Sequence, residues 1–220
     1  MDFKDALLEQ PYMNMRTYKG DSLLNINYIS QYFSKNKSKE KSTPKITIRN
    51  LKIIDGTIKY IDDNFPAYDS TFNYKTMVFE DLNLWITDFK MTDNININVK
   101  IHELSTNEKY GMQLKHLDCD FTINNNYFSM NNAHLSTSNS YLNADLIFRY
   151  NSFNSFKSFV DSVEMNMYFR PSDLSFVDIS FFAPEVRGVY VPVKLYGSLN
   201  GYANDLRSDN LKLILGKSSI

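Results

Sequence analysis

Histidine and carboxylate side chains come together at two places in the sequence, where acid–base or metal chemistry could arise. His102 is followed by Glu103, and His116, Asp118 and Asp120 recur at every second position. In an extended strand, residues two apart lie on the same face, so the last three could reach one metal ion. No second group of ligands follows, however, and the water-facing side of a strand accounts for the same residues. We therefore predict no metal site and no catalytic residues.

The other signals for catalysis are also weak. Cys119 lies between acidic neighbours but alternates with Leu117 and Phe121, so it belongs to the apolar side of the run. A thiol in such a place behaves as a small hydrophobic group rather than a nucleophile. The sequence has 7 glycines in 220 residues, with no phosphate-binding glycine loop and no serine nucleophile motif. We predict no cofactor and do not expect an enzyme.

Alternation of apolar and polar residues dominates the chain. It is clearest over residues 95–101 and recurs over 112–150, 189–195 and 211–215. A period of two is typical of β-strands with one apolar face and one polar face. The sequence therefore predicts a mainly β fold.

Turn and helix signals divide these strands. Asp55 and Gly56 stand between two apolar runs and predict a hairpin turn. Apolar residues recur every three or four positions over 153–163 and over 174–181, and Pro184 closes the second stretch. We therefore expect one or two short helices beside the strands.

The apolar faces of these strands need a cover, and two arrangements supply one. In a β-sandwich two sheets cover each other, and every alternating apolar residue is core. A single sheet that stays open and curls along its length instead forms a trough, apolar inside and polar outside. Such a trough suits lipid tails, because each methylene group kept from water is worth ~0.8 kcal/mol. Alternation fits both arrangements.

Composition bounds the class of protein. The chain has 43% hydrophobic and 15% aromatic residues, which is typical of a globular protein. A formal net charge of -1 means that the chain has no excess of positive charge to bind a phosphate backbone, so nucleic acid is not an expected partner. A single cysteine excludes an internal disulfide framework. No run of ~18 apolar residues occurs, and the first residues lack the apolar core of a secretory signal, so we predict neither a transmembrane segment nor a signal.

Three segments follow from the distribution of residue types. Residues 1–34 mix aromatic and aliphatic residues in short bursts and are predicted to form an N-terminal β or helical segment. Residues 35–44 are charged or polar without apolar residues, which predicts a flexible linker. Residues 45–220 contain the alternating strands.

Short phrases of the sequence occur in the same order as in a known family. Through them the chain resembles the AsmA-like superfamily, and specifically the TamB component of the translocation and assembly module in its Bacteroidetes-like form. No single phrase is diagnostic, so the order carries the resemblance. The phrases are YKGDSLLNI (18–26), ITIRNLKIIDGTIKYID (46–62), LDCDFTI through AHLSTSNSYL (117–142), PSDL followed by FAP (171–184), and VKLYGSLNG with NLKL (193–213).

The resemblance implies a non-enzymatic, bridge-like protein of outer-membrane biogenesis in the periplasm. Its fold would be an elongated, curled antiparallel sheet shaped like a taco, with a hydrophobic β-groove for phospholipid transport or for support of outer-membrane protein assembly. Family members are longer, with an inner-membrane anchor and a terminal domain that meets an outer-membrane barrel partner of the TamA or BamA type. The chain is therefore expected to be an internal fragment from the N-terminal half of such a protein. The resemblance implies that residues 45–220 form the β-groove region, with phospholipid acyl chains as its ligand.

Groove-lining residues are predicted from the apolar side of the alternating strands. They are Ile95, Ile97, Val99, Ile101, Leu117, Phe121, Leu142, Leu146, Phe148, Val189, Val191 and Val193.

Two other classes of protein remain open. A secreted or surface β-sandwich that acts as a binding or adhesion module would bury its apolar faces against each other and use Tyr- and Asn-rich loops such as 64–74. A carbohydrate-active β-solenoid enzyme would need carboxylates clustered on one polar face, which the sequence lacks. An uncovered apolar trough would favour lipid handling, and a sealed core would favour adhesion.

Overall fold

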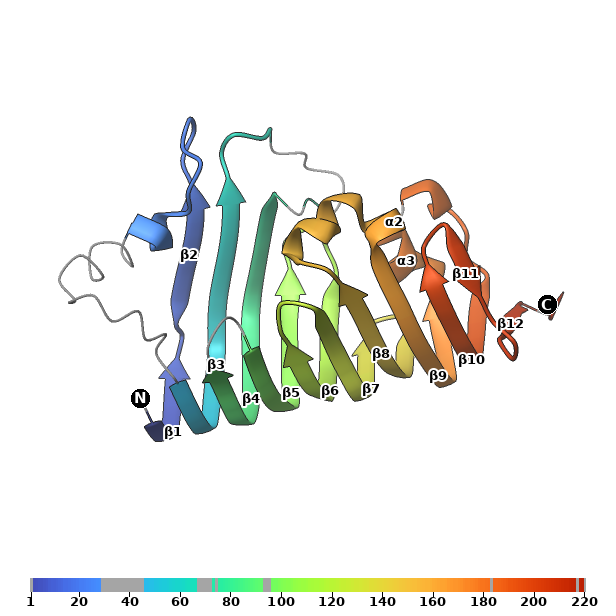
Figure 1. The fold of residues 1–220 in the computed structure, drawn as a ribbon, viewed down its shortest axis with the longest axis horizontal. Coiled ribbons are helices and arrows are strands. Elements are labelled where there is room, and N and C mark those ends of the chain that lie inside the picture. Colours follow the sequence, from blue (N-terminus) through green and yellow to red (C-terminus); the bar gives the residue numbers. More distant parts are fainter. Residues whose placement is uncertain are drawn as a thin grey trace.

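The computed structural model describes residues 2–28, 46–66, 73, 75–92, 96–182, 184–216 and 218–219. Within these residues all the strands belong to a single sheet. The long strands bend at one end, the lower end in the view of Figure 1, so that the sheet is curled. Strand order follows chain order from β3 to β10, and the described strands at the two ends of the sheet do not pair with each other. The strands are β1 (Asp2–Glu9), β2 (Tyr12–Thr17), β3 (Ile46–Asp62), β4 (Thr76–Thr92), β5 (Asn96–Glu108), β6 (Gln113–Ile123), β7 (Tyr127–Thr137), β8 (Tyr141–Tyr150), β9 (Val163–Ser175), β10 (Pro192–Tyr202), β11 (Asp205–Arg207), β12 (Lys212–Leu215) and β13 (Ser218–Ser219).

The predicted fold class, a mainly β protein with a curled sheet and short helices, is confirmed. Neighbouring strands from β3 to β10 pair antiparallel. The short helical segments include η1 (Phe153–Ser158), α2 (Phe159–Ser162), α3 (Phe176–Phe182) and η2 (Pro184–Val186), and residues 25–28 are helical as well.

The N-terminal residues join the same sheet, in parallel. β1 and β2 follow each other along the outer edge of β3, and both pair parallel with it. At the junction, the backbone N–H of Thr57 donates to the carbonyl of Pro11 at 2.8 Å, which keeps the edge continuous. Residues 2–9 and 12–17 are therefore strands of the main sheet. The predicted linker over 35–44 lies outside the described residues.

Bulges bend the long strands. Asp55, Asp81, Asp88 and Asn132 have positive φ angles of 56°, 51°, 58° and 51°. A shift in strand register accompanies each of them. Asp and Asn tolerate this left-handed backbone better than other residues with a side chain, and a bulge increases the local twist and bend of a strand. These four residues thus help the sheet to curl.

The predicted hairpin at Asp55 and Gly56 is wrong, because β3 continues through both residues, with a bulge, to Asp62. A two-residue type I′ hairpin turn needs positive φ at both central residues. Here Asp55 is left-handed and Gly56 is not. The same residue types that signal a turn serve a bulge at this position.

The two helical stretches are shorter than their spacing predicted. Helical residues cover 153–162 and 176–182, whereas Val163 and Leu174 belong to β9. Val163 pairs with Tyr150 of β8 and is fully buried, so strand pairing overrides the helical spacing there. In the part of the chain that the structure describes, no helix is both long and apolar enough to cross a bilayer.

At the C-terminal side, the chain passes close to the backbone of β10. Gly197 has φ +110°, and a Cβ atom placed on it would lie 2.9 Å from the Cα atom of Leu211 and closer still to the carbonyl oxygen of Asn210. Because real Cβ atoms do not approach backbone this closely, only glycine fits here.

Gly197→Ala is expected to lower the free energy of unfolding by about 3 kcal/mol or more, the sum of left-handed backbone strain and the clash. Gly111→Ala is the matched control, since Gly111 has φ +108° with open space around its Cβ position. It should cost only the strain, about 1–2 kcal/mol. Urea denaturation of both variants measures the difference, and equal losses would contradict the close approach.

Candidate functional site

One face of the sheet carries continuous apolar rows that cross from strand to strand. Residues directly opposite each other in an antiparallel pair share a face, so the pairing register identifies these rows. The first row is Ile97, Ile123, Phe128, Phe148 and Met165, from β5 to β9. The second row is Val99, Phe121, Met130, Leu146, Met167 and Leu199, from β5 to β10. We call the face that carries both rows the apolar face.

Most of the predicted groove residues lie on the apolar face. This follows from the pairing register and from the alternation of side chains between the two faces along each strand. They are Ile97, Val99, Ile101, Leu117, Phe121, Leu142, Leu146, Phe148 and Val193. Val189 and Val191 precede β10 and are 37% and 40% exposed, so they belong to the connection rather than to the sheet. Ile95 lies outside the described residues.

The apolar face is only partly buried. Leu117, Cys119 and Ala133 form a small buried cluster on it, against which half-buried neighbours such as Phe121 and Met130 pack. All strands of the described residues belong to one sheet, so no second sheet covers this face. The residues of the two rows on β5 to β8 keep intermediate exposure. In the part of the chain described, the two rows therefore keep some solvent exposure on this face.

An aromatic cluster covers one margin of the apolar face. Phe156 of η1 lies 4.8 Å from Tyr150 and 6.5 Å from Phe128, measured between ring centroids, and Phe159 of α2 lies 6.1 Å from Phe148. The Tyr150 hydroxyl donates to the carbonyl of Asn124 at 2.7 Å, and burial raises its pKa. The first helical stretch thus packs through aromatic rings on the ends of β7 and β8, and among the described residues no such ring contact is made to the rows on β5 and β6.

The histidines occupy the opposite, polar face. Asp118 binds two of them, with one carboxylate oxygen 2.9 Å from His116 Nε2 and the other 2.9 Å from His134 Nδ1. Burial acts to raise the pKa of Asp118, but the hydrogen bonds from His134 and His116 outweigh it and lower the pKa. Asp120 takes no part in this group and faces Asn132 instead.

Sequence reasoning missed His134, which reaches Asp118 only because β6 and β7 pair at that register. Among the described residues, no group of three or more His, Cys, Asp and Glu side chains is placed to hold a metal ion. His102, the remaining histidine, accepts or donates a hydrogen bond at 2.9 Å with Thr87 and stacks on Trp85 at 4.4 Å. These contacts fit a structural role on the polar face.

Glu108, at the end of β5, is a buried carboxyl group that is 3% exposed. Burial raises its pKa, and hydrogen bonds from backbone N–H groups, including that of Tyr110 at 2.6 Å, oppose the rise. Its Oε1 atom has no hydrogen-bond partner in the part of the chain described. Burying an ionised oxygen without full hydrogen bonding is costly.

Glu108→Gln is expected to stabilise the folded chain at neutral pH by about 1 kcal/mol. A carboxyl whose pKa is raised on folding binds its proton more tightly in the folded state, so its contribution is complete below its ordinary pKa of 4.5 and is lost as pH rises through the folded pKa. The gain should therefore vanish in acid. Thermal melts at neutral and acidic pH measure it, with exposed Glu103→Gln on the same strand as control. A gain of equal size at both pH values would contradict the assignment.

The chain matches no family model, no curated protein and no solved structure. Its resemblance to the AsmA-like superfamily therefore rests on the sequence phrases and stays a prediction.

Proposed function

We propose that this chain is a non-enzymatic lipid-handling module whose apolar face holds the acyl chains of phospholipids. The observation that supports the proposal is the pair of apolar rows that cross β5 to β9 on one face, without a second sheet over them in the described residues. A monomeric protein seldom exposes a continuous apolar surface without a ligand or partner for it.

The dimensions of the face suit hydrocarbon. Five neighbouring strands at ~4.8 Å spacing measure ~19 Å across, and one leaflet of membrane hydrocarbon is ~15 Å deep. An acyl chain that lies across the strands can therefore contact a whole row. At ~0.8 kcal/mol for each methylene group shielded from water, such a contact offsets much of the cost of carrying a lipid tail through an aqueous space.

The wider setting of the proposal comes from the sequence resemblance. We propose that the module belongs to a bridge-like protein of outer-membrane biogenesis in the periplasm, anchored in the inner membrane through a longer parent chain. Its role there would be phospholipid transport or support of outer-membrane protein assembly, with an outer-membrane barrel protein as partner. The polar face, with its ion pairs and histidines, would meet water.

Mass spectrometry of lipids that co-purify with the protein tests the proposal. We expect phospholipids at about one or more molecules per chain after a detergent-free purification. An unrelated β protein of similar size, purified from the same cells, sets the background. Lipid at the background level would overturn the proposal.

A further inference from the structure

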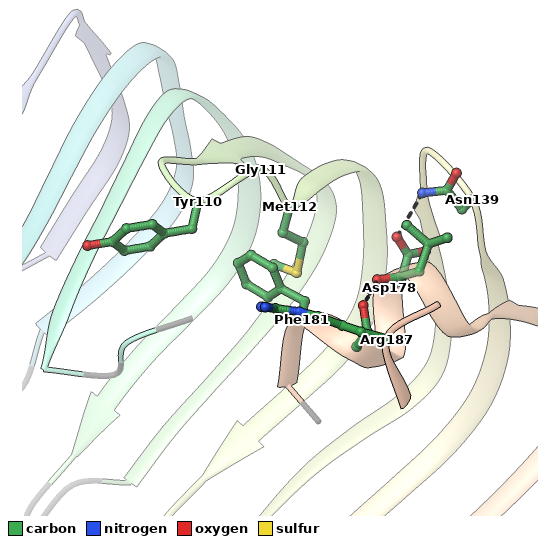
Figure 2. Close-up of a pocket in the computed structure, with 9 residues that line it drawn as sticks. Tyr110, Gly111, Met112, Asn139, Asp178, Phe181 and Arg187 are labelled. Atoms are coloured by element: carbon green, nitrogen blue, oxygen red, sulfur yellow. Dashed lines mark hydrogen bonds between the residues drawn. The ribbon is translucent and has the colours of Figure 1, made fainter. Parts of the chain in front are cut away.

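A cavity of about 230 Å³ lies where α3 meets the ends of the neighbouring strands (Figure 2). The turn between β5 and β6 contributes Met112, the turn between β7 and β8 contributes Asn139, and α3 contributes Asp178 and Phe181. Arg187, just after η2, also lines the cavity and is its positively charged residue. The cavity thus combines apolar walls with a cation, a carboxylate and an amide.

Asp178 fixes α3 in this place. Its carboxylate accepts hydrogen bonds from the hydroxyls of Thr137 and Ser140 and from the side-chain amide of Asn139 at 3.0 Å. With three donors already bound, this carboxylate has little remaining capacity to accept bonds from a ligand. Its place in the fold is to tie α3 to the turn between β7 and β8.

Arg187 supplies the group best suited to an anion. Arg187 and Phe181 both line the cavity, and in the view of Figure 2 the nitrogen atoms of Arg187 lie on the side of Tyr110. A guanidinium has five N–H donors in a planar fork, so it can keep a contact within the protein and still bind two oxygens of a phosphate. The ring of Phe181 and the side chain of Met112 also line the cavity.

The cavity lies at the strand ends opposite those that carry the two rows, next to the part of the apolar face that holds the buried cluster. Met112 directly precedes β6, and Leu114 of that strand packs against the buried cluster of Leu117, Cys119 and Ala133. Thr137, which binds Asp178, is paired with Leu114 across β6 and β7. A ligand with a charged end in the cavity would therefore reach the apolar face with its other end.

We propose that this cavity binds the phosphate-bearing head group of a lipid whose acyl chains lie on the apolar face, with Arg187 as the residue that contacts the phosphate. The proposal rests on the lipid-handling function above and adds the class of head group. The shared chemistry is a phosphate oxygen at a guanidinium, which free inorganic phosphate also offers.

The test uses two photoactivatable lipids with the same acyl chains, phosphatidylglycerol and diacylglycerol, crosslinked to the full chain. We expect Arg187→Gln to lower crosslinking of phosphatidylglycerol about tenfold and to leave diacylglycerol unchanged, because only the first lipid carries a phosphate. Arg187→Lys should fall between them, since it keeps the charge and loses the planar fork. Arg207→Gln, which removes an exposed guanidinium on β11 paired with Asp205, is the matched control.

Three other results would overturn the head-group site, the acyl-chain site or the lipid as the source of the phosphate. Equal crosslinking of phosphatidylglycerol by the wild-type chain and Arg187→Gln, at matched thermal stability, would overturn the head-group site and leave the acyl-chain proposal standing. Absence of crosslinking by either lipid to the wild-type chain would overturn both proposals. Complete block of phosphatidylglycerol crosslinking by millimolar inorganic phosphate, without loss of diacylglycerol crosslinking, would assign the cavity to free phosphate and overturn the lipid source.

Discussion

Replacing Ile97 and Val99 together with aspartate is expected to lower crosslinking of a photoactivatable phospholipid by more than tenfold. The two residues begin the two apolar rows at β5, and each row continues through directly opposite partners to β9. A carboxylate next to an acyl chain must give up its hydration, which costs several kcal/mol without a compensating partner. The ligand should therefore avoid the substituted rows.

The same strand offers the control. Asn98 and Lys100 alternate with the two substituted residues, are exposed, and lie on the polar face. Asn98→Asp with Lys100→Asp places two carboxylates on β5 without touching the apolar face, so crosslinking should be retained. Because Ile97 and Val99 are half-buried rather than sealed in a core, the doubly substituted chain should still fold, which circular dichroism checks. Unchanged crosslinking in a folded I97D and V99D chain would count against the apolar face as the lipid site.

Cys119 is expected to react with a thiol reagent about a thousandfold more slowly in the folded chain than in the unfolded chain at mildly alkaline pH. Its side chain is 4% exposed, and desolvation, with smaller contributions from the charges of Asp118 and Asp120, raises its pKa from 9.0 to about 12. The thiolate is the reactive form, and a rise of three pKa units lowers its fraction ~1000-fold.

Labelling rates in buffer and in concentrated urea measure this effect directly. The chain has one cysteine, so every labelled molecule reports on this position. Similar rates in both conditions would mean that the buried cluster at β6 and β7 opens readily in solution. Slow labelling would fit a thiol that serves packing rather than chemistry.

The alternation of apolar and polar residues correctly predicted which face of a strand each residue occupies. The alternation over Leu117 to Ile123 and over Leu142 to Phe148 placed these residues on one face, because side chains of a strand alternate whatever the strand pairs with. The same reasoning failed at Asp55, where a bulge and a hairpin turn call for similar residue types. The distinction depends on the backbone of Gly56, which residue type does not determine.

Contacts between segments that are far apart in the sequence could not be predicted from the sequence alone. The parallel pairing of β1 and β2 with β3 joins residues more than 40 positions apart, and nothing in residues 2–17 specifies that partner. The contact of His134 with Asp118 and the cavity between α3 and Met112 depend in the same way on register and on chain path. Periodicity identifies a face, whereas the site on that face is set by which strands become neighbours.

The agreement between strand order and chain order from β3 to β10 has a consequence for how the protein comes apart. Each of these strands is held mainly by the one before it and the one after it, so its stability is a nearest-neighbour property, as in a solenoid. Loss of an outer strand then removes one pairing and leaves the inner ones intact. We expect the chain to fray from its margins toward β6 and β7, with amide protection graded along the sequence rather than lost in one cooperative step.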